Sequence, residues 1–393
     1  MSSGGWLTLL PREWDLLPAK ALFSERREPG RPEDPHLTPS QVYGVLPQSE
    51  FIERTGGQVV LANSTPASMK RVLPDDFIIH LRSFQGGIER STISGRVSPA
   101  YTVLTPSELA EPRFFRWLLK SSAYIQELRT TTNQLRDGQA IGYRDFARIA
   151  LPTPTRAKQE QIADYLDRET AQIDRLIAKQ EQLVTRLHER RESQIAATLQ
   201  ERAWLERRIK DVASVVNGYP FDAATFMDAG GTPLVRIRDI VSTEYATFVP
   251  QEAVPSEAII CDGDIVIGMD GDFNSVLWSR GPAALNQRLC LLRTGTDALA
   301  SYLAYAVLRP LKLINDLTYS TTVKHLSSKQ VANIRIPLPP LDEQRRIVAH
   351  LDEQTAKIDT LIAKAQRFIE LAKERRAALI TAAVTGQLDV TAA

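Results

Sequence analysis

The sequence predicts an α/β (α+β) protein that contains one architecture twice: two modules of mixed strands and helices, separated by two long helices that pair as an antiparallel coiled coil. The main observation is a helical phrase, LDRETAQIDRLIAK at residues 166–179, which returns as LDEQTAKIDTLIAK at residues 351–364. Each copy also follows a proline-rich stretch, and the segments outside the phrases alternate short apolar runs with turn residues. A period this long indicates a duplicated domain-sized unit and not a short solenoid repeat.

The duplication extends well beyond this phrase. An ungapped alignment of residues 149–199 with residues 334–384 contains 20 identities in 51 positions, and half of these identities fall within the phrase. The two halves of the chain are therefore expected to be related by an internal pseudo-twofold repeat.

The long helices are predicted to begin after the prolines of IALPTP, residues 149–154, and of IRIPLPP, residues 334–340, because proline ends a preceding helix and fits a first turn. Apolar residues then recur at spacings of three and four, which is typical of amphipathic helices with coiled-coil character. A helix from about residue 159 to about residue 200 would be on the order of 60 Å long. The side chains expected to form the apolar stripe of this spacer are Leu166, Ile173, Ile177, Val184, Leu351, Ile358, Ile362 and Ile369.

A helix of this length cannot bury its apolar stripe alone, so the two copies are expected to bury each other. The pseudo-twofold repeat favours an antiparallel pair, with the two modules at opposite ends of the spacer. The alternative is that each helix packs separately on its own module. The expected divisions are residues 1–150 and 204–336 for the modules, residues 151–203 for the first long helix, and residues 337–393 for the second with its tail.

The modules resemble each other only at scattered anchors. LPDDFIIHL at residues 73–81 resembles ICDGDIVIG at residues 260–268: each has acidic turn residues followed by a short apolar strand. The segments that follow, residues 82–96 and 269–281, differ most. A common scaffold with different loops is typical of two readers of two targets, and these loops are rich in side chains able to read DNA base edges. Solvated turns are the alternative interpretation.

Composition places the chain among soluble globular proteins. It has 393 residues, 43% hydrophobic and 24% charged, which is enough for two or more domains. No long apolar run and no signal-like start is present, and the only cysteines are Cys261 and Cys290, so a cytoplasmic location is expected. The formal net charge of +1 argues weakly against unaided nucleic-acid binding, but it allows a subunit whose partner supplies phosphate contacts.

Motifs for catalysis are missing from the sequence. There is no G-x-x-x-x-G-K-[ST] loop, G-x-G-x-x-G fingerprint, H-E-x-x-H or paired C-x-x-C, and the five histidines have no metal-ligand spacing. The acidic cluster Asp262, Asp264, Asp270 and Asp272 could bind Mg²⁺ for phosphodiester hydrolysis, although CDGD and DGD are also ordinary turn sequences. A nuclease therefore stays open as the enzyme alternative.

The repeated helical residues carry a family resemblance. They are Pro152, Gln159, Ile162, Leu166, Asp167, Thr170, Ile173, Asp174 and Lys179, with Pro337, Gln344, Ile347, Leu351, Asp352, Thr355, Ile358, Asp359 and Lys364 in the second copy. Together with NGYPF at residues 217–221, PLVRIRDI at 233–240 and AVTGQLDV at 383–390, they make the chain resemble the specificity subunits (HsdS) of type I restriction-modification enzymes.

The resemblance implies a non-catalytic DNA reader without a cofactor or metal of its own. Each module would be a target recognition domain for one half of an asymmetric bipartite sequence, and the paired helices would set the gap. The implied partners are double-stranded DNA, two copies of a methyltransferase subunit docked along the helices, and a restriction-translocation subunit, with no membrane. S-adenosylmethionine, ATP and Mg²⁺ would belong to those partners.

The candidate DNA-contacting residues lie in the divergent loops and at two adjacent later positions in the second module. They are Arg82, Gln85, Arg90 and Ser91 in the first module, and Asp272, Asn274, Arg280, Lys324 and His325 in the second. The alternative from another class is a structural adaptor whose coiled coil joins two protein-binding modules without DNA. A salt-dependent gel shift by the assembled complex would distinguish the two.

Overall fold

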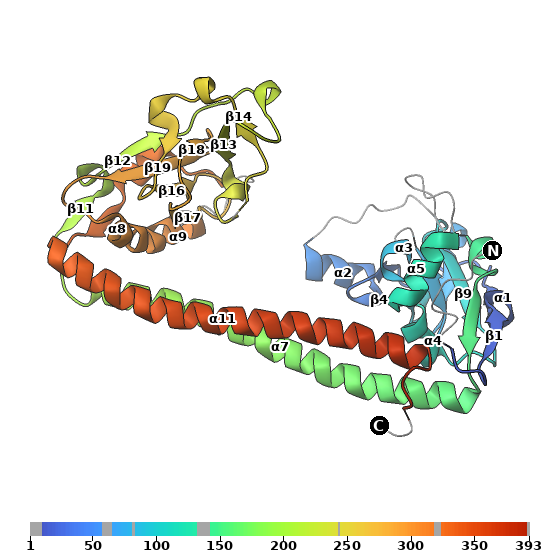
Figure 1. Ribbon diagram of the computed structural model, residues 1–393. Coiled ribbons are helices and arrows are strands. Elements are labelled where there is room, and N and C mark those ends of the chain that lie inside the picture. Colours follow the sequence, from blue (N-terminus) through green and yellow to red (C-terminus); the bar gives the residue numbers. More distant parts are fainter. Residues whose placement is uncertain are drawn as a thin grey trace. The chain divides into compact units, whose positions relative to one another are not determined.

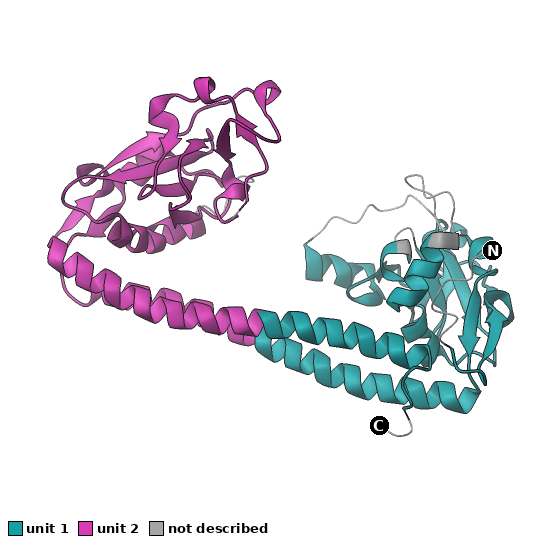
Figure 2. Cartoon of the chain, in the orientation of Figure 1, with its two compact units in different colours: residues 1–181, 367–393 teal, residues 182–366 magenta. Residues whose placement is uncertain are grey.

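The computed structural model describes residues 10–56, 65–80, 83–131, 142–242, 244–317 and 324–390. The chain divides into two compact units, one formed by Met1–Glu181 with Arg367–Ala393 and the other by Gln182–Gln366 (Figure 2). Each unit contains one module and a part of both long helices, so the division falls within the helices themselves.

The first module is built around a four-stranded antiparallel sheet in the order β2-β9-β6-β7, with three two-stranded sheets, β1-β10, β3-β4 and β5-β8 (Figure 1). Its strands are β1 (Asp15–Pro18), β2 (Phe23–Glu25), β3 (Leu37–Ser40), β4 (Gly44–Pro47), β5 (Lys70–Val72), β6 (Phe77–Ile79), β7 (Glu89–Arg90), β8 (Gly95–Val97), β9 (Thr102–Pro106) and β10 (Ala150–Thr153). Its helices are α1 (Ala19–Leu22), α2 (Gln48–Thr55), α3 (Ser83–Gly86), α4 (Pro112–Leu118), α5 (Ser122–Thr131) and α6 (Tyr143–Phe146).

The second module contains a four-stranded sheet in the order β12-β19-β16-β17, a second in the order β14-β13-β18-β15, and the pair β11-β20. Its strands are β11 (Glu206–Arg208), β12 (Ala213–Asn217), β13 (Thr232–Val235), β14 (Phe248–Val249), β15 (Ile259–Ile260), β16 (Ile265–Gly268), β17 (Ser275–Leu277), β18 (Ala283–Leu285), β19 (Leu289–Thr294) and β20 (Arg335–Pro337). Its helices are α8 (Ala300–Ala306), α9 (Leu308–Leu317) and α10 (Ser328–Asn333).

The central sheets of the two modules are equivalent, strand for strand. Phe77 of β6 is paired with Leu104 of β9, and Ile265 of β16 is paired with Leu292 of β19. The offset in residue number from Phe77 to Ile265 is the same as that from Leu104 to Leu292. Both pairs belong to antiparallel ladders that occupy the same position in their sheets. The duplication is therefore present in the modules, where sequence similarity is faint, and not only in the helices.

Strand alternation gives each central sheet two apolar faces, because successive side chains point to opposite sides. In the second module Ile265 and Ile267 join the core that includes α8 and α9, whereas Val266 joins the core shared with β13, β15 and β18. The first module repeats this pattern: Phe77 packs with α4 and α5, and Ile78 packs with residues of β3, β5 and β8. Helices cover one face of each sheet, and short strands cover the other.

The long helices are α7 (Arg156–Gln200), with 45 residues, and α11 (Leu341–Val384), with 44 residues. Each begins directly after a proline stretch, as the sequence predicts. Proline has no backbone N–H and is tolerated only in the first turn of a helix, so Pro154 and Pro340 separate each long helix from the strand before it. The chain leaves α11 through Gly386, whose φ is 72° and whose added Cβ would lie 2.4 Å from Pro11 Cγ. Only glycine fits this closely packed turn.

The helices pack antiparallel within each unit. In unit 1, Asp174 of α7 accepts hydrogen bonds from Arg376 of α11 at 2.8 and 3.3 Å. In unit 2, Asp359 of α11 accepts a hydrogen bond from Arg191 of α7 at 3.0 Å. The alignment of the two copies places Asp174 opposite Asp359 and Arg191 opposite Arg376, so both halves use the same contact with the two helices exchanged.

Seven of the eight apolar residues predicted for the spacer surface are buried, and Val184 is half-buried against Leu187, Ile358 and Ile362. Leu166 packs into the core of the first module and Leu351 into that of the second. Both kinds of packing expected from the stripe thus occur: the first turns pack on the modules, and later turns pair with the other helix. These buried side chains therefore stabilise the chain itself and are not available at its surface.

The predicted fold class is confirmed: two related modules of mixed sheets and helices are joined to long helices that pair antiparallel.

Because Leu351 is fully buried, Leu351→Ala should lower the free energy of unfolding by about 2–5 kcal/mol. Leu361→Ala, on the same helix but 50% exposed, should change it by less than about 0.5 kcal/mol. Urea unfolding followed by circular dichroism would measure both. Equal losses would contradict the assigned packing of α11.

Candidate nucleic-acid interface

The divergent loops of both modules grow from the same anchored turn. Asp76 and Asp264, directly before β6 and β16, are 1% and 3% exposed, and each accepts the backbone N–H of the residue three positions earlier, at 2.7 and 2.8 Å. Each is also held by an arginine: Arg26 donates to Asp76 at 2.7 and 3.0 Å, and Arg293 donates to Asp264 at 2.8 and 2.6 Å. Two-pronged arginine–carboxylate pairs fix orientation as well as charge, so the base of each loop is rigid.

The backbone of this turn is left-handed in both modules. Asp75 has φ 73°, and its counterpart Gly263 has φ 92°. Aspartate is among the few non-glycine residues that adopt this conformation readily. The carboxylate of Asp75 is therefore available at the surface, where it accepts a hydrogen bond from Arg90 Nε at 2.8 Å.

The candidate residues of the first module separate into different environments. Arg82 lies outside the described residues. Gln85 is exposed on α3, and Arg90 is half-buried and paired with Asp75. Ser91 is fully buried, and its hydroxyl donates to the carbonyl of Ile93 at 2.7 Å. Its burial argues against the predicted DNA contact and gives Ser91 a structural role.

A buried charge lies next to Arg90 in β7. Glu89 is 3% exposed, and Lys120 donates to its Oε2 at 2.8 Å. Burial raises the pKa of the Glu89 carboxyl, because the charged form loses its hydration, while the Lys120 ammonium acts in the opposite direction. Glu89 and Lys120 thus tie the short strand β7 to the end of α4.

In the second module the loop between β16 and β17 presents two polar side chains at its tip. Phe273 has φ 50°, unusual for an aromatic residue, and is only 2% exposed because its ring enters the module core. Its neighbours Asp272 and Asn274 are exposed. The buried ring anchors the tip, and the residues on both sides face solvent.

A cluster of charged side chains lies beside this tip. Asp270 Oδ1 lies 2.8 Å from His325 Nδ1, and Asp270 Oδ2 accepts a hydrogen bond from Arg288 Nη1 at 3.1 Å. Lys324 donates to Asn315 Oδ1 at 2.6 Å. Backbone bonds from Gly271 N to Lys324 O and from Leu326 N to Met269 O hold the two segments together. The structure thus brings Asp272, Lys324 and His325 to one surface.

Arg288 belongs to this surface although the sequence analysis did not select it. Its side chain is 65% exposed, and it precedes the buried strand β19. The available signal was position: Arg288 follows the turn residue Asn286, directly before an apolar strand, where loop side chains converge.

Arg280, in contrast, is used inside the module. Its guanidinium donates to the carbonyls of Ile240 at 2.8 Å and of Asp239 at 3.2 Å, and also to that of Ser242. It also stacks over the ring of Trp278, with Cζ 3.8 Å from the centroid. These contacts argue against the predicted role of Arg280 in reading DNA, because its donors are already occupied.

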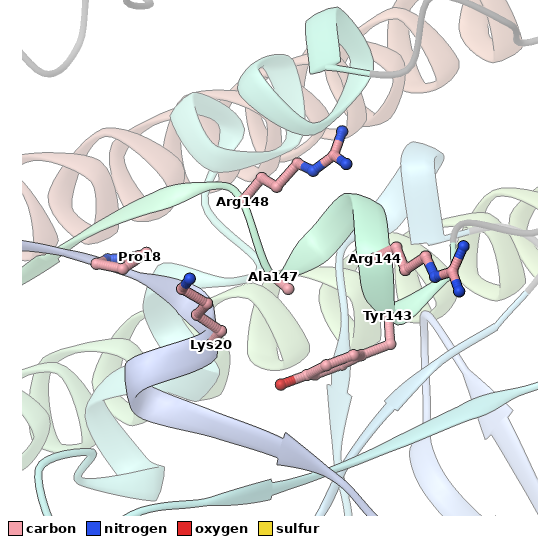
Figure 3. Close-up of a pocket in the computed structure, with 6 residues that line it drawn as sticks. All are labelled: Pro18, Lys20, Tyr143, Arg144, Ala147 and Arg148. Atoms are coloured by element: carbon pink, nitrogen blue, oxygen red, sulfur yellow. The ribbon is translucent and has the colours of Figure 1, made fainter.

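A basic hollow of about 470 Å³ in the first module is lined by residues at the junction of β1 and α1 and by residues of α6 and just after it (Figure 3). It is lined by Lys20, Arg144 and Arg148 together with Pro18, Tyr143 and Ala147. The three cationic side chains are exposed, and within the described ranges they form no hydrogen bond or ion pair. A concentration of unpaired cations favours an anion such as a phosphate group.

The acidic cluster considered for a nuclease is dispersed among structural contacts. Asp264 is neutralised by Arg293, Asp270 is paired with Arg288, and Asp262 accepts the backbone N–H of Gly281 at 2.8 Å. In the part of the chain that the structure describes, no three His, Cys, Asp or Glu side chains are arranged to hold a metal ion. Nor does any helix of that part have the length and apolar character needed to cross a membrane.

The fold and its surfaces define a class of protein: a duplicated scaffold that carries two different sets of polar loops on continuous helices. Residues 201–370 match the family model of the type I restriction modification DNA specificity domain. This match covers less than half of the chain, and solved structures of type I restriction-modification specificity subunits share the fold over almost all of it.

Relatives of known function agree with this family. The chain is 37% identical over 188 residues to the EcoBI specificity subunit of Escherichia coli, a match that covers 47% of this chain and 40% of the relative. It is 25% identical over 200 residues to the EcoKI specificity subunit of Escherichia coli strain K12, covering 47% of this chain and 43% of the relative. The matched region thus spans less than half of these curated relatives.

Solved structures share the fold over almost the whole chain. One, from work on complex assembly and conformational transition of the type I R-M system, has a TM-score of 0.73 at 17% identity and covers 96% of this chain and 99% of its own. The HsdS subunit of Thermoanaerobacter tengcongensis has a TM-score of 0.52 at 19% identity, with 96% and 98% covered. At these identities the similarity concerns the fold.

The internal role of Arg280 can be tested by unfolding. Arg280→Ala should lower the free energy of unfolding by about 2–4 kcal/mol, because it removes the stacking on Trp278 and the hydrogen bonds to the carbonyls of Asp239, Ile240 and Ser242. Arg288→Ala, an exposed arginine of the same module, should cost less than about 1 kcal/mol. Urea unfolding followed by circular dichroism measures both. A stable Arg280→Ala protein would return Arg280 to the set of candidate DNA contacts.

Proposed function

We propose that this chain is the DNA sequence-specificity subunit of a type I restriction-modification complex. The observation that carries the proposal is that two modules with the same central-sheet topology and the same anchored turn present different side chains at their loops. A half-site reader needs this arrangement, because the scaffold sets the position of the loop while the loop residues set which base is accepted. Each module reads one half of an asymmetric bipartite target.

The side chains best placed to contact DNA are Gln85 and Arg90 in the first module and Asp272, Asn274, Lys324 and His325 in the second, with Arg288 added. Amide, carboxylate and guanidinium groups match the donor and acceptor patterns of base edges in the major groove. The cations of the basic hollow, Lys20, Arg144 and Arg148, are suited to phosphates, which position a protein on DNA without reading its sequence.

The long helices provide the docking surface for two copies of a methyltransferase subunit. Several positions are identical in both copies of the repeat although they are exposed, and intrachain packing therefore does not account for them: Leu176 and Leu361, Lys179 and Lys364, Glu189 and Glu374, Arg190 and Arg375. Leu176 is 48% exposed and Leu361 50%. Two equivalent surfaces, each with an exposed leucine among charges, suit two identical partners.

Catalysis belongs to the partners on this proposal. The chain binds double-stranded DNA in the cytoplasm and holds no cofactor, while S-adenosylmethionine is used by the methyltransferase subunits and ATP with Mg²⁺ by a restriction-translocation subunit. The dispersal of Asp262, Asp264 and Asp270 into structural contacts supports a non-catalytic role.

Genome-wide methylation is the direct test. The chain would be co-expressed with the methyltransferase subunit encoded beside it, and modified adenines would be mapped by single-molecule sequencing. Methylation confined to one split motif is expected, because two modules on one spacer demand two half-sites at a fixed distance. A stable complex that methylates no split motif would refute the proposal and favour the adaptor that joins protein-binding modules.

Base reading and phosphate binding should separate in variants. Asp272→Ala and Asn274→Ala should change the accepted bases in the half-site of the second module only, at a cost of about 1–3 kcal/mol of discrimination per lost base contact. The triple variant Lys20→Ala, Arg144→Ala, Arg148→Ala should instead weaken cognate and random DNA alike and reduce the salt slope by about one per lost phosphate contact. Salt-dependent titrations of the assembled complex measure both. Equal loss on random DNA for Asp272→Ala would remove Asp272 from the reading surface.

Variants of the exposed leucines on the long helices test where the methyltransferase subunits dock. Leu176→Asp and Leu361→Asp should each reduce the number of bound methyltransferase subunits from two to one, and the double variant should bind none, because a charge in an apolar contact remains unpaired. Mass measurement of the purified complex gives the stoichiometry. The matched control is Leu313→Asp, an exposed leucine of α9 away from the repeated helices. Full stoichiometry in the double variant would show that the partners dock elsewhere.

A further inference from the structure

One buried glutamine occupies the same place in both copies of the repeat. Gln159 is the fourth residue of α7 and Gln344 the fourth of α11. They are 1% and 0% exposed, although glutamine is normally a surface residue. A primary amide at such a position needs partners for its donors and its acceptor, because burial removes water from them.

The amide of each glutamine has these partners, with nearly identical geometry. Gln159 Nε2 donates to Leu109 O at 3.0 Å and to Pro154 O at 2.8 Å, and its Oε1 accepts from Glu111 N at 2.8 Å. Gln344 Nε2 donates to Asp297 O at 2.9 Å and to Pro339 O at 2.8 Å, and its Oε1 accepts from Leu299 N at 2.8 Å. Equivalent backbone atoms serve as partners in both modules.

These bonds join three segments of each unit. The first is the end of the proline stretch, the second is the first turn of the long helix, and the third is the backbone on either side of Ala110 or Ala298, directly before α4 or α8. Only a neutral amide can donate to two carbonyls while accepting from an N–H. A carboxylate would repel the carbonyls, and an alkyl group would leave all three backbone groups unpaired.

A second polar contact follows about two turns further along each long helix. Asp167 accepts a hydrogen bond from Trp117 Nε1 of α4 at 2.9 Å, and Asp352 accepts one from Tyr305 Oη of α8 at 2.7 Å. The donors differ chemically, but the carboxylate and its position are kept. Two contacts separated along the axis restrict rotation of the module about the helix as well as its displacement.

The surroundings of the glutamines are not kept. Beside Gln159, Arg156 forms an ion pair with Glu111 at 2.5 Å, whereas leucines, Leu341 and Leu299, occupy these two positions in the second half. The two joints thus differ in how their exteriors are stabilised and share only the buried polar contacts. Either the ion pair or the two leucines can stabilise the junction between module and helix. The buried glutamine, which both junctions share, therefore indicates a geometric requirement that both have in common.

We propose that Gln159 and Gln344 are positioning residues for the gap in the bipartite target: each fixes the direction in which the long helix leaves its module. The inference rests on the proposed function and deepens it. A rigid spacer sets a distance only when the joint at each module is also rigid, since a pivoting module would reach its half-site at several separations. The glutamine and the aspartate that follows it supply that rigidity.

The test uses the chain assembled with its methyltransferase subunit. Gln159→Leu, Gln344→Leu and the double variant would be given a DNA library in which both half-sites are constant and the gap varies by one or two base pairs. The ratio of methylation at the cognate gap to that at a gap changed by one base pair should fall about tenfold, because a module that pivots on its helix can reach both gaps. Both half-sites should still be required.

The matched control is Gln161→Leu, which removes an exposed amide from the same turn of α7 and should leave the ratio unchanged. Circular dichroism and thermal unfolding establish that each variant is folded. If the leucine variants do not fold, Asp167→Asn and Asp352→Asn loosen the second contact more gently and should lower the same ratio.

Two results would overturn the inference: an unchanged ratio in folded variants, or an equal loss of methylation at every gap, which would indicate a structural role alone. Failure of the proposed function is distinguishable, because then the unaltered complex would already lack a split methylated motif.

Discussion

Burial of one apolar stripe that occurs twice is the constraint on which the rest of the structure depends. Neither long helix can remove its stripe from water alone, and the two copies are complementary when they run in opposite directions. Antiparallel pairing also places each copy of Asp174 opposite an arginine, which explains why Asp174–Arg376 and Asp359–Arg191 are the same contact with exchanged helices. The first module is continuous with the start of α7 and packs against the end of α11, and the second is continuous with the start of α11 and packs against the end of α7.

Polar groups that are buried and fully paired then fix what apolar packing leaves adjustable. Apolar contacts are non-directional, so the sheet and the helices could slide over one another at little cost. Asp76 and Asp264 fix the turn from which each loop grows, and Gln159 and Gln344 fix the first turn of each long helix. A misplaced partner at any of these positions leaves a buried polar group unpaired, and this penalty selects one geometry.

The sequence predicted the fold class and the helix starts, because repetition and proline act through local rules that need no tertiary information. It did not predict which loop residues face outward. Ser91 and Arg280 are residue types that can contact bases, but both are used within the fold. The Ser91 hydroxyl donates to a carbonyl of its own turn, and the Arg280 guanidinium donates to carbonyls of a distant segment of the chain. Arg288 was missed for the same reason, since side-chain direction in a loop is set by distant contacts. Gln159 and Gln344 carried a readable signal, one polar residue at one helix position in both copies.

The formal net charge of +1 is consistent with a protein that reads DNA sequence, because several of its carboxylates are paired with basic side chains near the candidate DNA-contacting residues. Asp75 beside Arg90, and Asp270 beside Arg288 and His325, weaken attraction to phosphate in general but hold the basic side chains in fixed orientations. Specificity is a difference between affinities for right and wrong sites, and a large phosphate term adds equally to both. On the proposed function, carboxylates at the DNA-contacting surface lower the affinity for phosphate, which is common to all sites. They also hold in place the basic side chains that discriminate between bases. Two modules then need only modest affinity each, because the helices that link them make the second half-site contact intramolecular.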